Sequence, residues 1–360
     1  MALSKLNHRS FVDTVEGNPS LIINGDMAIS QRGTSFTTPT AYTIDRIFVS
    51  HTATDQLVTT VSQSSTAPSG FSNSLRINVT TAETALAADE VVYFETSVEA
   101  QNLQHLNYGA SSAKSLTASF WVRSSLTGKY SVLFYQHDAV RSNLQSFNIN
   151  TADTWEYKTI TIDGDTGGTI NDDNGKGLSL YFTLAAGTNY TGTPHTGWGA
   201  YVQTDDFAFS DNVDFSAQTG NFYITGIKLE VGSEATPFLH ENYAENLNKC
   251  RRYYYRRSSG GTNDGFLQGG SEGGSTFVGL YTFPVSMRAS PSYSSANGTN
   301  YFFVYNGSSV QFNTLSGFVI QSTESCLLYE NTFGSSLTSS SPYNCRFQNA
   351  SAYIDFDAEL

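Results

Sequence analysis

The chain has 360 residues, of which 14% are charged and 13% are aromatic, and its formal net charge is −13 at pH 7. A surface with this negative balance repels duplex DNA and anionic membranes as a whole, so the composition argues against nucleic acid and membranes as partners. The length allows two or three domains with cores of their own. Phe and Tyr stand among many Gly, Ser, Thr and Asn residues, which is typical of short strands joined by polar turns and predicts an all-β protein.

Residues 1–19 are predicted to form an N-terminal attachment arm. They are polar and have few apolar side chains to bury, so they suit a segment that becomes ordered when it docks on something else. Within the arm, LSKLN is one of two clear helix candidates in the chain. The arm lacks the apolar core of a secretory signal, and no window of the chain is apolar enough for a transmembrane helix, so we expect synthesis and folding in a cytoplasm.

Residues 20–235 are predicted to form one jelly-roll domain. Short apolar runs alternate there with turn clusters, and nine of them read as strands: LIING, YTIDRIFV, SLRINV, VVYFETSV, SLTASFWVRS, YSVLFY, WEYKTITI, LSLYFTL and FYITGIKLEV. Nine short strands in this space predict a sandwich or jelly roll.

Residues 236–258 are predicted to form a connecting helix. Thr236-Pro237 ends the last strand, and Asn242 with Glu245 three residues later forms the pattern of a capping box. Apolar residues then recur at spacings of four, three and four, at Tyr243, Leu247, Cys250 and Tyr254. Acidic residues lead and basic residues trail, which matches the helix dipole and favours a structural role for RRYYYRR over nucleic-acid binding. We therefore expect Tyr243, Leu247 and Tyr254 to be buried in a subunit or domain contact.

Residues 259–360 are predicted to form a second, smaller β domain. It opens with a glycine-dense stretch that reads as a flexible boundary or hairpin tip, and its strands are separated by Asn-Gly and Ser-Gly turns. The three cysteines are odd in number and have no metal-type spacing, so they predict buried thiols, with a bridge between Cys326 and Cys345 left open. The fold class is thus all-β: a jelly-roll β-sandwich, a short connecting helix and a second smaller β-sandwich domain.

Four blocks carry a resemblance to a known group of proteins. They are SLIINGDMAISQRGTSF with YTIDRIF, WEYKTITIDGDTGGTINDDNGKGLSLYFTLAAG, GIKLEVGSEATPFLHENYAENLNKCRRYYYRR and FPVSMRASPSY. Together they resemble tail-fibre and virion structural proteins of tailed bacteriophages, whose jelly roll is similar to carbohydrate-binding modules. The resemblance implies a homotrimeric tail fibre or appendage on the particle exterior that contacts the host surface. The arm would bind other virion proteins, and host surface polysaccharide would be the receptor. A capsid decoration, head-fibre or tail-assembly protein with no receptor is the alternative.

Sugar binding needs aromatic rings that lie flat against pyranose faces, with polar groups beside them. In SLTASFWVRS the apolar residues share one face, so Trp121 points to the other face. Tyr93 and Tyr135 are expected to join Trp121 in a glycan site if their strands are its neighbours. Packing of Trp121 under a covering loop is the alternative, because most Trp side chains are largely buried.

No cofactor is expected, and a structural calcium ion is the one candidate that the sequence leaves open. The resemblance implies a calcium beside the opening motif, where Asp26 is the candidate ligand, although alanine stands at the position of the usual acid. The loop DGDTGGTINDDNG also holds four aspartates, which read as a solvated turn or a second calcium candidate. No catalytic residues are expected: Gly269–Gly273 matches the letters of a nucleophile elbow but lacks the strand before it, the helix after it and a later histidine. We expect a protein that is not an enzyme.

Overall fold

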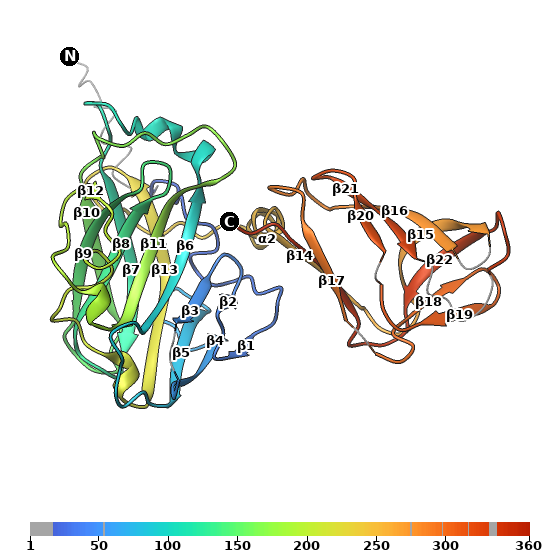
Figure 1. The fold of residues 1–360 in the computed structure, drawn as a ribbon, viewed down its shortest axis with the longest axis horizontal. Helices are drawn as coiled ribbons and strands as arrows, with labels where there is room; N and C mark the ends of the chain where they lie inside the picture. Colours follow the sequence, from blue (N-terminus) through green and yellow to red (C-terminus); the bar gives the residue numbers. More distant parts are fainter. Residues whose placement is uncertain (1–16, 53–54, 274–275, 297, 316, 331–336) are drawn as a thin grey trace, which may run out of the picture. The chain divides into compact units, whose positions relative to one another are not determined.

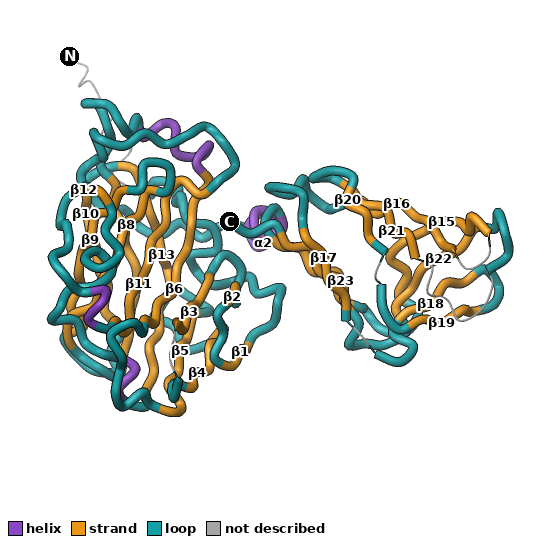
Figure 2. Tube along the Cα trace, in the orientation of Figure 1, coloured by secondary structure: helices purple, strands orange, loops and turns teal. Residues whose placement is uncertain are grey.

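The computed structural model describes residues 17–52, 55–273, 276–296, 298–315, 317–330 and 337–360. It divides into two compact units, one of Met1–Asn246 with Leu360 and the other of Leu247–Glu359. Nearly all the regular structure is strand (Figure 1, Figure 2). The predicted arm, with its helix candidate LSKLN, lies almost entirely outside the described residues.

The first unit is a jelly-roll sandwich of two antiparallel sheets (Figure 1). The six-stranded sheet has the order β1 (Ser35–Thr37), β4 (Val58–Ser64), β5 (Ser74–Thr81), β13 (Gly220–Val231), β7 (Leu116–Ser124) and β10 (Glu156–Ile162). The seven-stranded sheet has the order β12 (Gly199–Ala200), β9 (Arg141–Ile149), β8 (Gly128–Gln136), β11 (Lys176–Ala186), β6 (Val91–Glu99), β3 (Phe48–Thr52) and β2 (Ala41–Tyr42). Three 3-10 turns connect strands: η1 (Ala100–Leu106), η2 (Thr188–Tyr190) and η3 (Phe215–Ala217).

The core of this unit lies between the two sheets. Phe94 and Phe182 of the seven-stranded sheet stack with ring centroids 4.7 Å apart, and Phe120 of the six-stranded sheet meets Phe182 at 5.2 Å. All three are at most 1% exposed. Burying a phenylalanine contributes roughly 1.5–3 kcal/mol, so this contact between the layers is a large part of what holds them together. Because these residues alternate with outward-facing ones, each strand also presents a second face.

The run LIING does not form the predicted strand. Residues 21–25 bend instead, and the Asn24 side chain bridges two backbone segments by donating to the carbonyls of Ile29 and Asp45 at 2.9 Å. The amide of Ile29 donates in turn to Asn24 Oδ1 at 2.9 Å. A buried asparagine thus supplies the hydrogen bonds that a strand ladder would have made.

The connecting helix is shorter than predicted. Helix α2 spans Tyr243–Arg251, and Asn242 Oδ1 accepts a hydrogen bond from the amide of Ala244 at 2.9 Å, as a helix cap does. The chain then enters strand β14 (Tyr254–Ser258), which pairs with β23 (Tyr353–Asp357). The Arg256 and Asp355 side chains lie opposite each other there, 2.6 Å apart. Aromatic residues fit a paired strand better than a helix, so pairing with β23 outweighs the continued helical stripe.

The burial prediction for this stripe is therefore wrong at Tyr243, which is 62% exposed. Leu247 is half-buried, and Tyr254 is buried, but on a strand rather than on the helix. Tyr243 is the first residue of the helix, and helical spacing alone could not show which face of a nine-residue helix is covered. The role of the three residues in a subunit contact stays a prediction.

The second unit is a smaller sandwich. Its three-stranded sheet has the order β14, β23 and β17 (Ser292–Ser295). Its seven-stranded sheet has the order β19 (Ser309–Phe312), β18 (Phe302–Tyr305), β22 (Pro342–Phe347), β15 (Asp264–Gly273), β16 (Thr276–Thr282), β21 (Ser325–Glu330) and β20 (Phe318–Ile320). The core joins both sheets, with Phe356 of β23 meeting Phe318 of β20 at 5.4 Å. All three cysteines are buried, and Cys326 and Cys345 are not joined by a bridge.

Most of the glycine-dense stretch forms strand β15, which pairs with β16 as one arm of a hairpin, so the hairpin reading fits better than the flexible boundary. Strand β15 includes Gly269, where a Cβ atom would lie 2.1 Å from the carbonyl oxygen of Val278 on β16. Glycine thus permits an approach between strands that any other residue would block. Among the described residues, no helix is long and apolar enough to cross a membrane.

Candidate functional site

Tyrosines gather on the outer face of the seven-stranded sheet of the jelly roll. Tyr93 of β6, Tyr181 of β11 and Tyr135 of β8 each alternate with core phenylalanines and so point away from the other sheet. Because β11 pairs with both β6 and β8, the rings form a row: Tyr93 lies 5.4 Å from Tyr181, which lies 6.2 Å from Tyr135. With Tyr201, described next, these residues form what we call the tyrosine face.

The segment 187–209 crosses part of this sheet and adds to the row. The Tyr201 ring lies 4.8 Å from that of Tyr135, and the Phe207 ring lies 5.1 Å from that of Tyr93. The Thr183 hydroxyl donates to the carbonyl of Phe207 at 3.0 Å, which fastens the segment to β11. The tyrosines of the face remain half-buried, so part of each residue stays in contact with solvent.

A single buried carboxylate holds the Tyr201 part of this segment. Asp206 is fully buried, and its oxygens accept hydrogen bonds from the His195 amide at 3.0 Å and the Val202 amide at 2.8 Å. The Ser142 hydroxyl on β9 donates to it at 2.9 Å, and the His195 ring lies within 3.0 Å. Burial opposes ionisation of Asp206, but these hydrogen bonds outweigh it and hold its pKa below the usual value.

Polar groups stand beside the rings. Lys176 forms an ion pair with the buried Glu95 at 2.6 Å, and Tyr181 is hydrogen-bonded to Glu95. The His137 ring lies 4.5 Å from that of Tyr135, and its Nε2 lies 2.7 Å from the Ser179 hydroxyl. Donors and acceptors thus alternate with apolar ring surface along the row.

These groups are close to electrically neutral at physiological pH. Burial raises the pKa of the tyrosine hydroxyls on the face, so they stay protonated and can donate hydrogen bonds. Burial, helped by the positive charge of Lys176, lowers the pKa of His137 to about 3, so its ring is uncharged. The Lys176 and Glu95 charges compensate each other. Such a surface suits an uncharged ligand that offers both hydroxyl groups and C–H surface.

Of the three residues predicted for a glycan site, the structure brings two together. Tyr93 and Tyr135 share the tyrosine face, with Tyr181 between them. Trp121 lies on the other sheet, because β7 is in the six-stranded sheet and β6 and β8 are in the seven-stranded one. The condition for a three-residue site, that the strands of Tyr93 and Tyr135 neighbour that of Trp121, is therefore not met. The alternation in LSLYFTL would have shown that Tyr181 faces away from the core. No local pattern marks Tyr201, which lies in a long loop.

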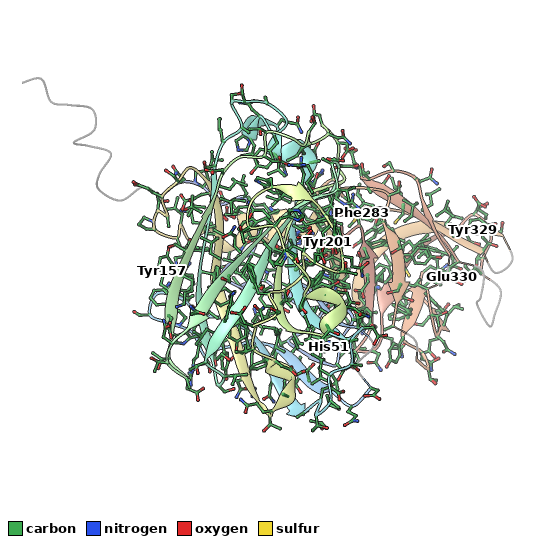
Figure 3. The ribbon with its side chains drawn as sticks, turned by 60° about the vertical axis from the view of Figure 1, so that its left-hand side comes forward. His51, Tyr157, Tyr201, Phe283, Tyr329 and Glu330 are labelled. Carbon is green, nitrogen blue, oxygen red and sulfur yellow. The ribbon has the colours of Figure 1, made fainter. Side chains whose placement is uncertain are left out.

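Trp121 has its own aromatic neighbour. It is half-buried and lies opposite Tyr157 of β10, with the two rings 5.3 Å apart and Tyr157 44% exposed. Figure 3 labels Tyr157 and Tyr201 on different sides of the jelly roll. The glycan-binding role of Trp121 stays a prediction.

The two calcium candidates from the sequence are Asp26 and the aspartate-rich loop. Asp26 has His240 Nδ1 at 3.6 Å and Asn246 Nδ2 at 3.5 Å as neighbours rather than other carboxylates. In the aspartate-rich loop, Asp165 pairs with Arg141 at 2.7 Å and Asp173 accepts from the Gly175 amide at 2.8 Å, so these two serve the local turn structure. Within the described part of the chain, neither arrangement gathers three or more acidic groups.

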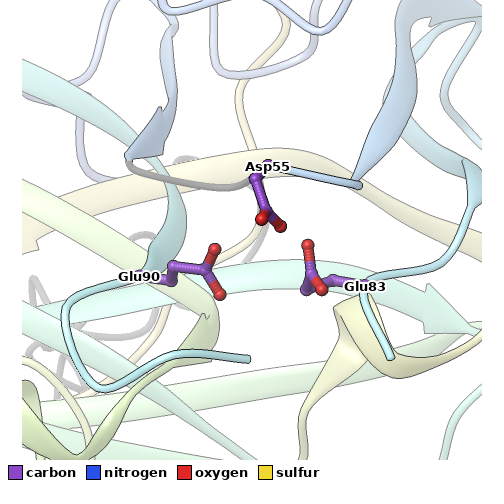
Figure 4. A group of neighbouring side chains, drawn as sticks. All are labelled: Asp55, Glu83 and Glu90. Carbon is purple, nitrogen blue, oxygen red and sulfur yellow. The ribbon is translucent and has the colours of Figure 1, made fainter. Parts of the chain in front are cut away.

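A different trio of carboxylates does converge. The side chains of Asp55, Glu83 and Glu90 point toward one another, with ligand atoms all within 4.8 Å (Figure 4). Glu83 and Glu90 are 1% and 3% exposed. Their oxygens also accept backbone hydrogen bonds, from Gln56 at 3.1 Å for Glu83 and from Ala87 at 2.6 Å for Glu90. The trio has the oxygen chemistry of a hard-cation site, and sequence analysis missed it because its members come from two separate loops.

No protein-family model matches the sequence, and no curated protein does. Among solved structures, the chain is similar to the enzymatically active domain of tailspike protein 4 of bacteriophage CBA120. The identity is 13% and the TM-score 0.32, over 59% of this chain and 21% of that chain, so it spans about a fifth of the tailspike.

Two further solved structures are similar to this chain. One is a family 11 carbohydrate-binding module from Clostridium thermocellum in complex with a mixed-linked tetrasaccharide, at 14% identity and a TM-score of 0.28, over 56% of this chain and 98% of that chain. The other is a cyclase from Fischerella sp. TAU, at 10% identity and a TM-score of 0.33, over 62% of this chain and 100% of that chain. These proteins differ in activity, so the function of this chain is argued below from its own residues.

Proposed function

We propose that this chain is a structural protein of a bacteriophage virion, a tail fibre or related appendage, and that the tyrosine face of its jelly roll binds polysaccharide on the host surface. The observation that carries the binding role is the row of half-buried tyrosines with its paired charges and hydroxyl groups. Rings with exposed faces pack against the C–H surfaces of sugars, and the polar groups between them match sugar hydroxyls.

The virion assignment rests on the resemblance of the four sequence blocks. In this proposal residues 1–19 attach the chain to other virion proteins, three copies associate, and the β units are displayed on the particle exterior. The protein binds its glycan without cleaving it. Tyrosine is well suited to such a surface because it offers a large rigid ring and a hydroxyl group while ordering only two side-chain torsions.

The test measures binding of the purified chain to bacterial surface polysaccharides immobilised as a panel of O-antigen, capsular and teichoic acid preparations. We expect at least one to bind, and Tyr135→Ala and Tyr201→Ala each to weaken it roughly threefold to tenfold, the equivalent of one aromatic contact. Tyr157→Ala is the matched control, because this exposed tyrosine lies on the other sheet. Equal losses in all three variants, or no binding to any preparation, would refute the tyrosine face as the receptor site.

The virion role needs a separate measurement. Immunogold electron microscopy of phage particles that carry the chain should place it on the tail or an appendage, and light scattering of the purified protein should give three times the mass of one chain. Labelling confined to the capsid, together with no binding to host cells, would instead favour a capsid decoration or head-fibre protein. Release of fragments from a bound polysaccharide would overturn the non-enzymatic assignment.

A further inference from the structure

A cleft opens at one side of the jelly roll, between strand β9 of one sheet and the edge strand β10 of the other. Its volume of about 420 Å³ is within the range of small-molecule sites. Three segments line it: β9, the turn that follows β10, and the loop before β12. We call it the edge cleft, and the residues used below are Arg141, Asn143, Gln145, Asp163, Asp165 and Trp198.

Two side-chain amides on β9 form one wall of the cleft. Asn143 is 3% exposed, and its Oδ1 accepts from Gln145 Nε2 at 2.7 Å. Within the described part of the chain, the Asn143 amide N–H groups have no hydrogen-bond partner. Gln145 Nε2 also donates to the carbonyl of Thr196 at 2.8 Å, which leaves Gln145 Oε1 as an acceptor. The residual exposure of Asn143 leaves its Nδ2 open to the cleft, so this donor can pair with water or with a ligand, and the Gln145 Oε1 acceptor stands next to it.

Trp198 adds an aromatic ring to the lining of the cleft, and its position is fixed by several contacts. The Trp198 indole donates to the carbonyl of Asp163 at 2.7 Å, and its ring meets that of Tyr108 edge-on at 5.7 Å. Arg141 pairs with the buried Asp165 at 2.7 Å and donates to the Trp198 carbonyl at 3.2 Å. Because these contacts set the positions of the lining groups before any ligand arrives, little ordering cost remains at binding.

The charge in the cleft selects against acidic ligands. Arg141 is compensated by Asp165, which is 0% exposed, whereas the exposed Asp163 carboxylate has no compensating cation among the described residues. The cleft therefore carries one uncompensated negative charge, which repels phosphates and carboxylated sugars. The Trp198 ring, an amide donor beside an amide acceptor and an excess carboxylate together suit an uncharged ring that carries adjacent hydroxyl groups.

We infer that the edge cleft is a second binding site, which takes one neutral sugar residue and works independently of the tyrosine face. The class of ligand, a sugar, rests on the proposed function. The inference adds the place where the sugar binds and the requirement that it be uncharged. A glycan bound at two separate points of one jelly roll gains from the high effective concentration of its second site.

The experiment titrates the whole chain with methyl glycosides of glucose, galactose and mannose, and with methyl glucuronide as the acidic probe, by saturation-transfer NMR. We expect at least one neutral glycoside to bind and Asn143→Ala to raise its Kd roughly threefold to tenfold, as loss of one hydrogen bond does. Gln145→Ala, at a half-buried position, should do the same. Asn148→Ala is the control, because Asn148 is exposed on the same strand and outside the cleft. Asp163→Asn should raise the affinity for the glucuronide relative to the neutral glycosides.

The outcomes separate this inference from the proposed function. Weaker binding in the cleft variants with unchanged binding in Tyr135→Ala supports the edge cleft, even if the polysaccharide panel gives no binding at the tyrosine face. If Asn143→Ala does not fold, Gln145→Ala and Asp163→Asn decide. The inference is overturned if no neutral glycoside binds, if Gln145→Ala binds as well as Asn148→Ala does, or if Tyr135→Ala alone abolishes binding.

Discussion

Replacement of Asp206 by asparagine should loosen the segment that carries Tyr201. The carboxylate is fully buried and accepts four hydrogen bonds, two at each oxygen. Asparagine keeps one acceptor oxygen and turns the other into an NH₂ group that faces the donors. If the retained oxygen serves His195, the Val202 amide loses its partner, while the Ser142 hydroxyl can rotate and accept. Hydrogen bonds to a charged group contribute about 1.5–3 kcal/mol each, so we expect a loss of roughly 2–3 kcal/mol in the free energy of unfolding.

The loss should depend on pH with a definite sign. The hydrogen bonds hold the pKa of Asp206 below its value in the unfolded chain. The stabilisation is therefore complete above the unfolded pKa, about 3.9 for an aspartate, and is lost as the pH falls through the lower folded value. The difference in stability between the wild-type chain and Asp206→Asn should be largest near neutral pH and shrink below about pH 4.

Urea unfolding followed by tryptophan fluorescence, between pH 3 and pH 7, measures this difference, and Trp198 lies in the same segment. The matched control is Asp205→Asn, which removes the same charge from a carboxylate whose one hydrogen bond within the described part of the chain comes from the Thr204 hydroxyl, at 3.3 Å. We expect the control to stay within about 0.5 kcal/mol of the wild type, as surface substitutions usually do. Equal effects of the two substitutions, or a loss that persists unchanged at pH 3, would refute the role given to Asp206.

Three other substitutions test the packing and charge arguments. Lys228→Met should lower the free energy of unfolding by about 3–5 kcal/mol, because it removes the ion-pair partner of the buried Glu230 carboxylate. The two side chains are 1% and 0% exposed, and Lys228 Nζ lies 3.2 Å from Glu230 Oε1. In thermal melts the double variant Lys228→Met with Glu230→Gln should recover part of that loss. Gly269→Ala should lower the free energy of unfolding by about 1–3 kcal/mol through overpacking. Gly270→Ala is the control and should be nearly neutral, because its new Cβ has its nearest neighbour at 3.6 Å. Similar melting temperatures for the two variants would contradict the close approach of the strands. Asp55→Asn should raise the free energy of unfolding by about 0.5 kcal/mol in the presence of EDTA, because it removes the repulsion between Asp55 and the two buried glutamates. A melting temperature that falls instead would show that the trio needs its third charge.

The candidate sites were predictable only in part. Alternation within single strands places Tyr93, Tyr135 and Trp121 away from the core, and it would have placed Tyr181 there too. It does not tell which of these faces are shared, because strand order results from contacts between segments far apart in the chain. Tyr201 and Trp198 lie in a loop held by Asp206 and Asp163, and a loop of this kind leaves no periodic signal.

The sequence by itself determined the all-β class, the outward or inward direction of most strand residues and the cap of the helix at Asn242. These features depend on interactions between neighbours along the chain, which a period of two or a capping residue expresses directly. Only the tertiary structure decided that Trp121 and Tyr93 belong to different sheets, that Tyr254 leaves the helix to pair with β23, and that a glycine-dense stretch is a strand. In each case a long-range pairing supplied more stabilisation than the local preference, and only the folded chain brings those partners together.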